Sequence, residues 1–329
     1  MINISVIIRC YNEAQHIGKL LDGILLQNRQ DVEIIIVDSG STDGTIEIAS
    51  RYFVKLVNIR PEDFSFGRAL NLGCQAATGD FIVIASGHVY PVYQDWLESL
   101  ISPFNNSQVA LTYGKQKGDE NTKYSEKQIF AAWFPEFSEN DENQDHPFCN
   151  NANAAIRRSL WQKNSYNESL TGLEDLDWAK RVMANGFKIV YVPEAEVVHI
   201  HDEPPLRIYN RYRREAIALK NIYPREKFNL WDFFRLLIIN STSDFYYAFR
   251  DAVLMQEAHS IMLFRLMQFW GTYRGYAHQA PISNQLRKTF YYPRSLCDYR
   301  SSLPKYSRQT IDYDSQSKNV KQALLHKLD

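Results

Sequence analysis

Short apolar runs alternate with amphipathic segments along the first part of the chain. Four runs rich in Ile, Val and Phe predict buried strands, and they are Ile4–Ile8, Val32–Val37, Val54–Asn58 and Phe81–Ala85. Between them, apolar residues recur at the spacing of an amphipathic helix, in residues 17–25, 46–52 and 69–77. Strands that alternate with helices in this way predict an α/β fold, with a mostly parallel sheet flanked by helices.

Polar residues follow three of the predicted strands at the point where each strand ends. They occupy residues 9–13, 38–43 and 86–88. In open α/β sheets, ligands bind beyond the carboxyl ends of the strands. The sequence therefore predicts one binding site that is built from these three segments.

The pattern changes after about residue 204, where the chain becomes helix-like and rich in Arg and Tyr. A long helical region is predicted for roughly 230–274, and the residues after it are polar, with a weak periodicity that is typical of partly disordered segments. We therefore divide the chain into an α/β domain at 1–215, a helical C-terminal region at 216–310 and a polar tail at 311–329.

The composition is that of a globular protein, with 45% hydrophobic residues, 23% charged residues and a formal net charge of -1. This balance lacks the basic excess of most nucleic-acid-binding proteins, so we expect no nucleic-acid partner. The four cysteines have neither metal-site nor redox spacing, which indicates free thiols in a reducing compartment. The sequence has no signal-peptide pattern and no run near the roughly 20 apolar residues of a membrane span. We therefore expect a cytoplasmic protein, with peripheral contact at the inner face of the membrane left open.

Carboxylates mark two positions where chemistry is expected. Asp38 lies between a strand and a Gly/Ser turn, where it can accept hydrogen bonds from the base or ribose of a nucleotide. Capping of the next helix is the structural alternative. Glu174, Asp175 and Asp177 lie together at the start of a predicted helix, where acidic residues complement the helix dipole. Three carboxylates are more than capping needs, so one of them is a candidate general base for an acceptor hydroxyl.

Histidines form a second group of candidate residues. His88 follows Ser86-Gly87 at the end of the fourth strand, where Gly87 would let the backbone approach a diphosphate. His199 and His201 are two residues apart on another predicted strand, so they face the same side and can meet a cation or a phosphate together. The structural alternatives are a loop residue for His88 and a core histidine for one member of the pair.

Six segments, taken in this order, resemble the family-2 glycosyltransferases of the GT-A fold. They are 6–13 (Val-Ile-Ile-Arg-Cys-Tyr-Asn-Glu), 37–45 (Val-Asp-Ser-Gly-Ser-Thr-Asp-Gly-Thr), 69–79, 151–158 (Asn-Ala-Asn-Ala-Ala-Ile-Arg-Arg), 174–177 (Glu-Asp-Leu-Asp) and 197–201 (Val-Val-His-Ile-His). The resemblance covers roughly residues 3–215. Within the family, the segments at 151–158 and 197–201 look closest to bacterial rhamnosyltransferase-like enzymes of polysaccharide assembly. The resemblance implies that residues 1–215 form a GT-A catalytic domain.

The resemblance also implies a role for individual residues. Asp175 matches the catalytic base of inverting members, and Glu174 is the less favoured choice. The residues assigned to the nucleotide sugar are Arg9, Tyr11, Glu13, Asp38, Arg68, Asn71, Ser86 and Gly87. On the acceptor side we assign Asn153 and Trp178.

One position departs from the family pattern. Members usually carry Asp-x-Asp, which holds a divalent cation against the leaving diphosphate, where this chain has Ser86-Gly87-His88. His88 can still bind Mn²⁺ or Mg²⁺ together with His199 or His201, although imidazole suits transition metals better than Mg²⁺. Protonated histidines and arginines that stabilise the diphosphate without a metal are the alternative, and a site that has lost activity is a third outcome.

Residues and resemblance together predict an inverting glycosyltransferase. It would move a hexose from a nucleotide-diphospho-sugar to a hydroxyl of a glycan or lipid-linked acceptor, in bacterial surface polysaccharide synthesis. The basic and aromatic segment 207–214 would bind the diphosphate or a lipid-linked acceptor at the membrane, and a solvated helix face is the equal alternative. The rival functions are a non-catalytic nucleotide-sugar-binding protein and a sugar nucleotidyltransferase. The latter usually has a Gly-rich basic loop where this chain has Cys10–Glu13.

Overall fold

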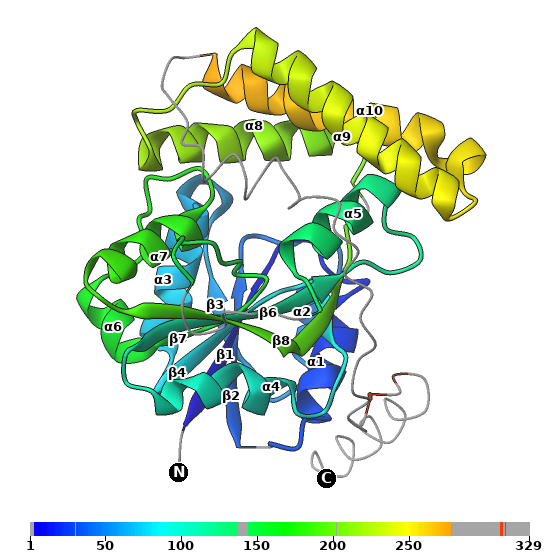
Figure 1. Cartoon of the computed structure of the whole chain (residues 1–329). Coiled ribbons are helices and arrows are strands. Elements are labelled where there is room, and N and C mark those ends of the chain that lie inside the picture. Colours follow the sequence, from blue (N-terminus) through cyan, green and yellow to red (C-terminus); the bar gives the residue numbers. More distant parts are fainter. Residues whose placement is uncertain are drawn as a thin grey trace.

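The structure is a computed structural model that describes residues 3–29, 31–136, 144–201, 203–277, 310, 311 and 313. In these residues, eight strands form one mixed sheet in the order β3-β2-β1-β4-β7-β6-β8-β5 (Figure 1). The strands are β1 Ile4–Cys10, β2 Val32–Asp38, β3 Lys55–Asn58, β4 Phe81–Ser86, β5 Val89–Pro91, β6 Val109–Lys117, β7 Asn153–Arg157 and β8 Lys188–His199. Strands β1 to β4 pair in parallel, as does β6 with β8, whereas β7 and β5 pair antiparallel with their neighbours.

Helices connect and cover these strands. The α-helices are α1 Ile17–Leu25, α2 Thr45–Ala49, α3 Phe66–Ala76, α4 Trp96–Ile101, α5 Tyr124–Trp133, α6 Arg158–Lys163, α7 Glu174–Ala184, α8 Pro205–Ile222, α9 Leu230–Arg250 and α10 Leu254–Tyr276. Two short 3₁₀ turns lie at Pro61–Asp63 and Ser102–Asn105. The predicted α/β class is therefore confirmed.

The four predicted strands are all present, and β1 is longer than expected. It continues through Arg9 to Cys10, so these two residues extend in the sheet rather than in a loop. The predicted helix at 46–52 is shorter, because α2 begins at Thr45 and ends at Ala49. The hydrophobic pattern located the elements, and hydrogen bonding to neighbouring strands decided where they end.

The sheet is covered on both faces, which explains the continuous apolar runs of its central strands. Ile8 packs with Leu21 of α1 and Trp96 of α4 on one face. Ile7 points the other way and packs with Leu70 of α3 and Trp178 of α7. Neighbouring residues of one strand thus belong to two separate cores, as the period of two requires.

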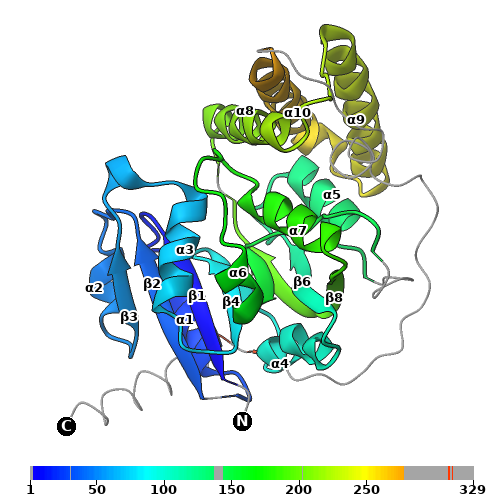
Figure 2. The ribbon, with the colours of Figure 1, turned by 90° about the vertical axis from the view of Figure 1, so that its left-hand side faces the viewer.

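The last three helices form a separate layer above the sheet, next to α5 (Figures 1 and 2). Residues of α8, α9 and α10 share one apolar cluster that includes Leu219, Phe233 and Phe269. The predicted helical region at 230–274 is two helices, which are joined by a turn with Ala252 at a φ of 58°. The predicted boundary at 215 lies inside α8, so the division of the chain into domains stays a prediction. Most of 311–329 lies outside the described residues.

Candidate active site

The three polar segments predicted to form a site do lie at one edge of the sheet. In the parallel register, Cys10 of β1 is opposite Asp38 of β2, and Arg9 is opposite Ser86 of β4. The carboxyl ends of the three strands are therefore neighbours, as the rule for parallel sheets predicts.

Hydrogen bonds join the loop after β1 to the loop after β2. The Asn12 backbone N–H donates to Ser41 Oγ at 2.8 Å, and Asn12 Oδ1 accepts from the Thr42 N–H at 2.8 Å. The Glu13 N–H donates to Thr45 Oγ1 at 2.7 Å. Asn12 adopts a left-handed φ of 57°, which Asn tolerates better than most residues. The loops after β1 and β2 are thus held in one shape without a ligand.

Asp38 is buried at the end of β2 and shapes its own turn. Its carboxylate accepts hydrogen bonds from the Gly40 N–H at 2.9 Å, from the Ser41 N–H at 3.1 Å and from Ser41 Oγ at 2.5 Å. These contacts show that the carboxylate orients the turn after β2, and its contact with a nucleotide stays a prediction. Tyr11 follows the end of β1 and is 57% exposed.

Three residues assigned to substrate contacts have structural roles instead. Asn71 donates to the Tyr166 carbonyl and Glu168, and its Oδ1 accepts from Trp161 Nε1 and the Tyr166 N–H. Its amide therefore ties α3 to the segment before α7, in place of a nucleotide-sugar contact.

The two acceptor-side assignments are corrected in the same way. Asn153 is fully buried, accepts from Trp96 Nε1, and donates to the carbonyls of Lys115 and Ala195. Trp178 is fully buried in the core and donates from Nε1 to the Asn164 carbonyl at 2.5 Å. Neither side chain reaches a surface that an acceptor can contact. Arg68, by contrast, is exposed on α3.

His88, His199 and His201 are brought together and are called the histidine cluster below. One ring nitrogen of each lies within 4.8 Å of those of the other two. The ring of His88 stacks on that of His199 with centroids 5.1 Å apart, and the rings of His199 and His201 are 4.1 Å apart. The predicted same-side arrangement of His199 and His201 is therefore what the structure has.

Each histidine of the cluster turns its Nδ1 to a side-chain oxygen. The three contacts are His88 to Glu13 at 2.7 Å, His199 to Gln116 at 2.7 Å and His201 to Glu126 at 2.8 Å. An oxygen acceptor at Nδ1 places the proton there and leaves the lone pair on Nε2. Metal-binding histidines are oriented in this way by acceptors that lie behind them.

The Nε2 atoms suit a cation in a second respect. His199 Nε2 is buried and has no hydrogen-bond partner among the described residues. Burial lowers the pKa of His199 well below its ordinary 6.5, and the neighbouring His201 and His88 add to this effect. Burial also lowers the pKa of His201, although Glu126 acts in the opposite direction. A neutral imidazole with a free Nε2, as at His199, is a ligand for a transition metal or zinc, so a group of three histidines fits a divalent cation.

Glu126 and Arg211 belong to this site and were not predicted individually. Glu126 of α5 is buried and accepts from Arg211 Nη2 at 2.7 Å, while Arg211 Nη1 lies 3.1 Å from His201 Nδ1. Burial raises the pKa of Glu126, but Arg211 and His201 outweigh it and lower that pKa to about 2. Arg211 lies in the basic segment 207–214, where one of the two predicted alternatives was a solvated face. The structure places this arginine inside the molecule, where it also pairs with Glu203 at 2.8 Å.

Gly87 allows the Glu13 side chain to approach closely, and its predicted approach to a diphosphate stays a prediction. A Cβ at this position would lie 2.8 Å from Glu13 Cγ. Glycine therefore lets Glu13 reach His88, whereas the sequence suggested an approach to a diphosphate. This contact makes Glu13 a partner of the histidine cluster.

Asp175 lies at the start of α7, where its carboxylate accepts from two backbone groups. Oδ2 accepts from the Asn151 N–H at 3.0 Å, and Oδ1 from the Leu176 N–H at 2.8 Å. Burial and the adjacent Glu174 charge raise the pKa of Asp175 to about 7, against the two hydrogen bonds, which lower it. The preceding residue, Leu173, has a left-handed φ of 55°, a strained backbone of the kind that clusters at active sites.

Glu174 is in a different environment from Asp175. Its Oε1 pairs with Arg9 Nη1 at 3.2 Å, and its side chain is only 5% exposed. The Arg9 guanidinium also lies over the Phe66 ring, 5.0 Å from its centroid. The ion pair with Arg9 occupies the Glu174 carboxylate, so Asp175 is the better candidate for the general base.

Asn151 is a further candidate that sequence reasoning missed. Its side chain is buried, and neither its Oδ1 nor its Nδ2 has a hydrogen-bond partner in the described part of the chain. Buried side-chain amides nearly always form hydrogen bonds. An amide without a partner next to Asp175 therefore indicates that a polar ligand binds here. The sequence has an Asn at both 151 and 153, and the assignment from the sequence chose Asn153.

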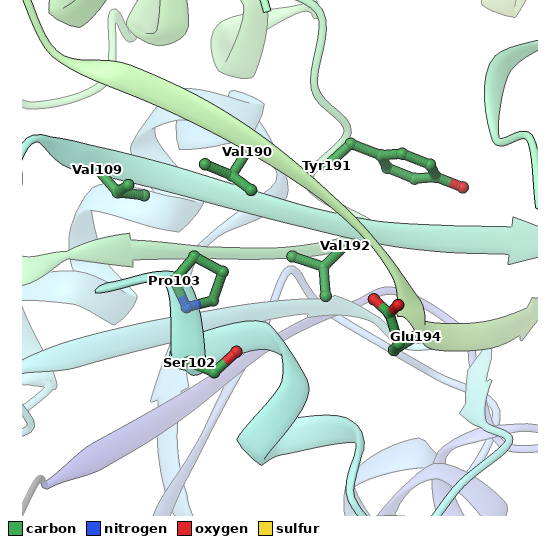
Figure 3. Close-up of a pocket in the computed structure, with 7 residues that line it drawn as sticks. All are labelled: Ser102, Pro103, Val109, Val190, Tyr191, Val192 and Glu194. Carbon is green, nitrogen blue, oxygen red and sulfur yellow. The ribbon is translucent and has the colours of Figure 1, made fainter. Parts of the chain in front are cut away.

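A separate hollow of about 240 Å³ lies at the other end of β6 and β8. Figure 3 shows Val109, Val190 and Val192 along its wall, with Glu194 at one side. It has one carboxylate and no histidine, so it offers little chemistry compared with the strand-end site.

Comparison with known proteins identifies the part of the chain that carries this site. Residues 5–164 match the family described as glycosyl transferase family 2. This segment is a family 2 glycosyltransferase domain. The resemblance found in the sequence is therefore confirmed.

Curated relatives support the same assignment. The chain is 30% identical over 201 residues to the O-antigen chain rhamnosyltransferase WbaN of Salmonella anatum, and this match covers 56% of the chain and 62% of the relative. It is 28% identical to the O-antigen chain rhamnosyltransferase RfbN of Salmonella typhimurium, over 64% of this chain and 70% of the relative. The match thus spans less than two thirds of the first of these relatives.

Solved structures share the fold of this chain. The mannosyltransferase PcManGT of Pyrobaculum calidifontis, solved with GDP-Man and Mn²⁺, superposes with a TM-score of 0.56 at 21% identity and 84% coverage of both chains. Glucosyl-3-phosphoglycerate synthase of Mycobacterium tuberculosis, solved with Mg²⁺ and UDP, gives a TM-score of 0.50 at 20% identity, over 67% of this chain and 79% of the other. The predicted GT-A fold is confirmed. Among the described residues, the helices are too short or too polar to cross a membrane.

Proposed function

We propose that this chain is an inverting glycosyltransferase that uses a nucleotide-diphospho-sugar and a hydroxyl acceptor, and that Asp175 is its general base. The observation that carries the proposal is the environment of Asp175. A carboxyl with a pKa of about 7 can accept a proton near neutral pH, and its backbone hydrogen bonds fix its orientation.

The proposed reaction is a single displacement. Asp175 takes the proton from the acceptor hydroxyl, and that oxygen bonds to the anomeric carbon from the face opposite the diphosphate. The bond from the anomeric carbon to the diphosphate oxygen breaks, and both electrons leave with the nucleoside diphosphate. The configuration at the anomeric carbon is therefore inverted.

The strand-end loops provide the nucleotide side of the proposed site. Asp38 and Tyr11 border a turn that is already fixed by hydrogen bonds, so little order has to be gained on binding. Arg9 is held between Glu174 and Phe66, which would place its positive charge near the diphosphate. Asn151 is the residue that we assign to a hydroxyl of the transferred sugar, because its amide is buried and unpaired.

The histidine cluster is the proposed metal site. Its three Nε2 atoms would hold Mn²⁺ in preference to Mg²⁺, since imidazole is a softer ligand than oxygen. When bound, the cation would offset the charge of the diphosphate. Lowered pKa values of His199 and His201 favour this role over protonated histidines that act without a metal.

The acceptor and the sugar are proposed from the relatives. Both Salmonella proteins are named O-antigen chain rhamnosyltransferases, so a rhamnose nucleotide and a glycan or lipid-linked acceptor of surface polysaccharide synthesis are the first substrates to test.

The test is a transfer assay that follows the nucleotide product. Release of a nucleoside diphosphate that depends on the acceptor supports glycosyl transfer, whereas release of pyrophosphate would indicate a nucleotidyltransferase. Binding without any product would indicate a binding protein. Asp175→Asn should bind the nucleotide sugar like the wild type and lose transfer, and near-normal turnover of this variant would reject Asp175 as the base.

A further inference from the structure

Helix α9 exposes large hydrophobic side chains and buries several polar ones beside Phe233 and Leu236. Its buried residues include four polar or charged side chains, Asp232, Asn240, Ser241 and Asp244. Apart from Arg250 at its end, the exposed large side chains of the helix are hydrophobic, and they are Leu230, Trp231, Phe234, Ile238, Ile239, Tyr246 and Phe249. A helix at the surface of a water-soluble domain normally shows the opposite pattern.

Helix α10 likewise buries polar side chains among its apolar ones. It buries Arg265, whose guanidinium donates to both carboxylate oxygens of Asp244, at 2.7 Å and 2.8 Å. Ser125 of α5 donates to the same carboxylate at 2.6 Å. A buried pair of this kind is costly to break, so it holds the polar sides of both helices inward.

The exposed sides of α9 and α10 carry large hydrophobic side chains, and we call this surface the outer face. Sixteen large hydrophobic side chains are exposed in the described residues, and eleven of them lie on α9 and α10. The four on α10 are Met255, Met262, Leu266 and Trp270. Such a concentration marks an interaction surface, because scattered single residues would need no explanation.

The charges around the outer face are mostly positive. Arg225 and Lys227 are exposed just before α9, and Arg250 is exposed at its end. Arg274 of α10 is exposed and lies over the Trp270 ring, 5.9 Å from its centroid. Both carboxylates of α9 are buried.

Two acidic groups lie near this surface, at the same end of α9 as Arg250. Asp251, in the turn after α9, is exposed and accepts from the Tyr124 hydroxyl at 2.8 Å, and Glu257 of α10 is half-buried. The outer side of α9 therefore combines tryptophan, phenylalanine and aliphatic residues with arginine and lysine at its ends.

We propose that the outer face lies on the surface of a lipid bilayer that contains anionic lipid. Aromatic side chains favour the boundary between acyl chains and headgroups, and nearby cations are attracted to anionic headgroups. A symmetric pair of these chains fits less well, because each outer face would meet the same cations without a carboxylate on α9 to pair with them. Arg211 of the segment 207–214 pairs with Glu126 and Glu203, so the outer face is a second surface, apart from that arginine, for contact with a membrane.

The proposal is independent of the transferase activity, and so is its test. Purified full-length chain is mixed with vesicles of phosphatidylcholine alone or with phosphatidylglycerol, and the bound fraction is measured by sedimentation. We expect binding to the anionic vesicles. The variant Trp231→Gln/Ile238→Gln/Phe249→Gln should lower the partition coefficient at least about tenfold, because three exposed apolar side chains are removed from the contact.

Charge and position are tested by two further variants. Arg250→Gln should weaken binding to anionic vesicles about fivefold and leave binding to phosphatidylcholine unchanged. The matched control Phe53→Gln/Leu56→Gln removes exposed apolar side chains far from the outer face and should bind like the wild type. Circular dichroism checks that all variants are folded.

Two results would overturn the proposal. One is a wild-type chain that binds neither kind of vesicle, which would mean that the outer face is covered by something other than lipid. The other is a wild-type dimer in light scattering that the triple variant converts to a monomer without any change in vesicle binding.

Discussion

The raised pKa of Asp175 predicts that the residue proposed for catalysis destabilises the fold. An ordinary aspartate has a pKa of 3.8, and burial beside Glu174 raises that of Asp175 to about 7. The folded state therefore favours the protonated carboxyl, while the unfolded chain favours the ionised one. The resulting penalty is absent below about pH 4, grows as the pH rises to about 7, and is complete above that value.

The size of this effect follows from the two pKa values. A shift from 3.8 to about 7 corresponds to about 4 kcal/mol at high pH. Because Asp175 keeps some contact with solvent, screening reduces this value, and we expect about 2 kcal/mol. Asn cannot ionise, so Asp175→Asn should gain more stability over the wild type at about pH 8 than at about pH 5, by about 1 kcal/mol or more.

Urea unfolding of both proteins at the two pH values measures this difference. The control is Asp177→Asn on the same turn of α7, which loses an ion pair with Arg181 at 2.9 Å and should gain no stability as the pH rises. A gain for Asp175→Asn that is equal at both pH values would refute the reasoning. It would mean that the carboxyl ionises normally and is not tuned for proton transfer.

The remaining predictions concern the metal and the groups around it. Treatment with a chelator should abolish transfer, and added Mn²⁺ should restore it; unchanged activity after chelation would exclude a metal at the histidine cluster. Glu126→Gln should weaken Mn²⁺ binding by roughly tenfold or more, measured by calorimetry, because the carboxylate that orients His201 is lost. Glu126 should also stabilise the wild type above about pH 4.5 and less as the pH falls toward 2, because its pKa is lowered to about 2. Asn151→Ala should raise the KM for the donor or lower kcat, and leave thermal stability nearly unchanged, because the amide has no internal partner; a large loss of stability would instead indicate a structural residue.

Much of the fold could be predicted from hydrophobic periodicity alone. Runs such as Ile4–Ile8 and Val32–Val37 are apolar throughout because both faces of the central sheet are covered. The rule that parallel strands end at one edge then brought Arg9, Asp38 and Ser86 together without any structural information. These inferences depend on short stretches of chain, which a single sequence contains in full.

The direction and the partners of a side chain depend on the rest of the molecule. Glu126 is 75 residues from His201, and Gln116 is 83 residues from His199, so no local pattern links them. Asn151 and Asn153 illustrate the same limit within one motif. Both are buried, but Asn153 has three internal hydrogen bonds and Asn151 has none from its amide. Only the packing of β6, β7 and β8 distinguishes the two.

One helix, α8, joins the proposed metal site to the outer face. Arg211 of α8 contacts Glu126 and His201, while the other side of the helix packs closely against α10. The approach is so close that a Cβ at Gly271 of α10 would lie 2.4 Å from the Tyr209 carbonyl oxygen of α8. A surface that binds a bilayer through α9 and α10 would therefore rest on the same helix that orients the histidine cluster. If both proposals hold, the position of the enzyme on the membrane and the geometry of its metal site are set by a single element, which would keep the site close to a lipid-linked acceptor.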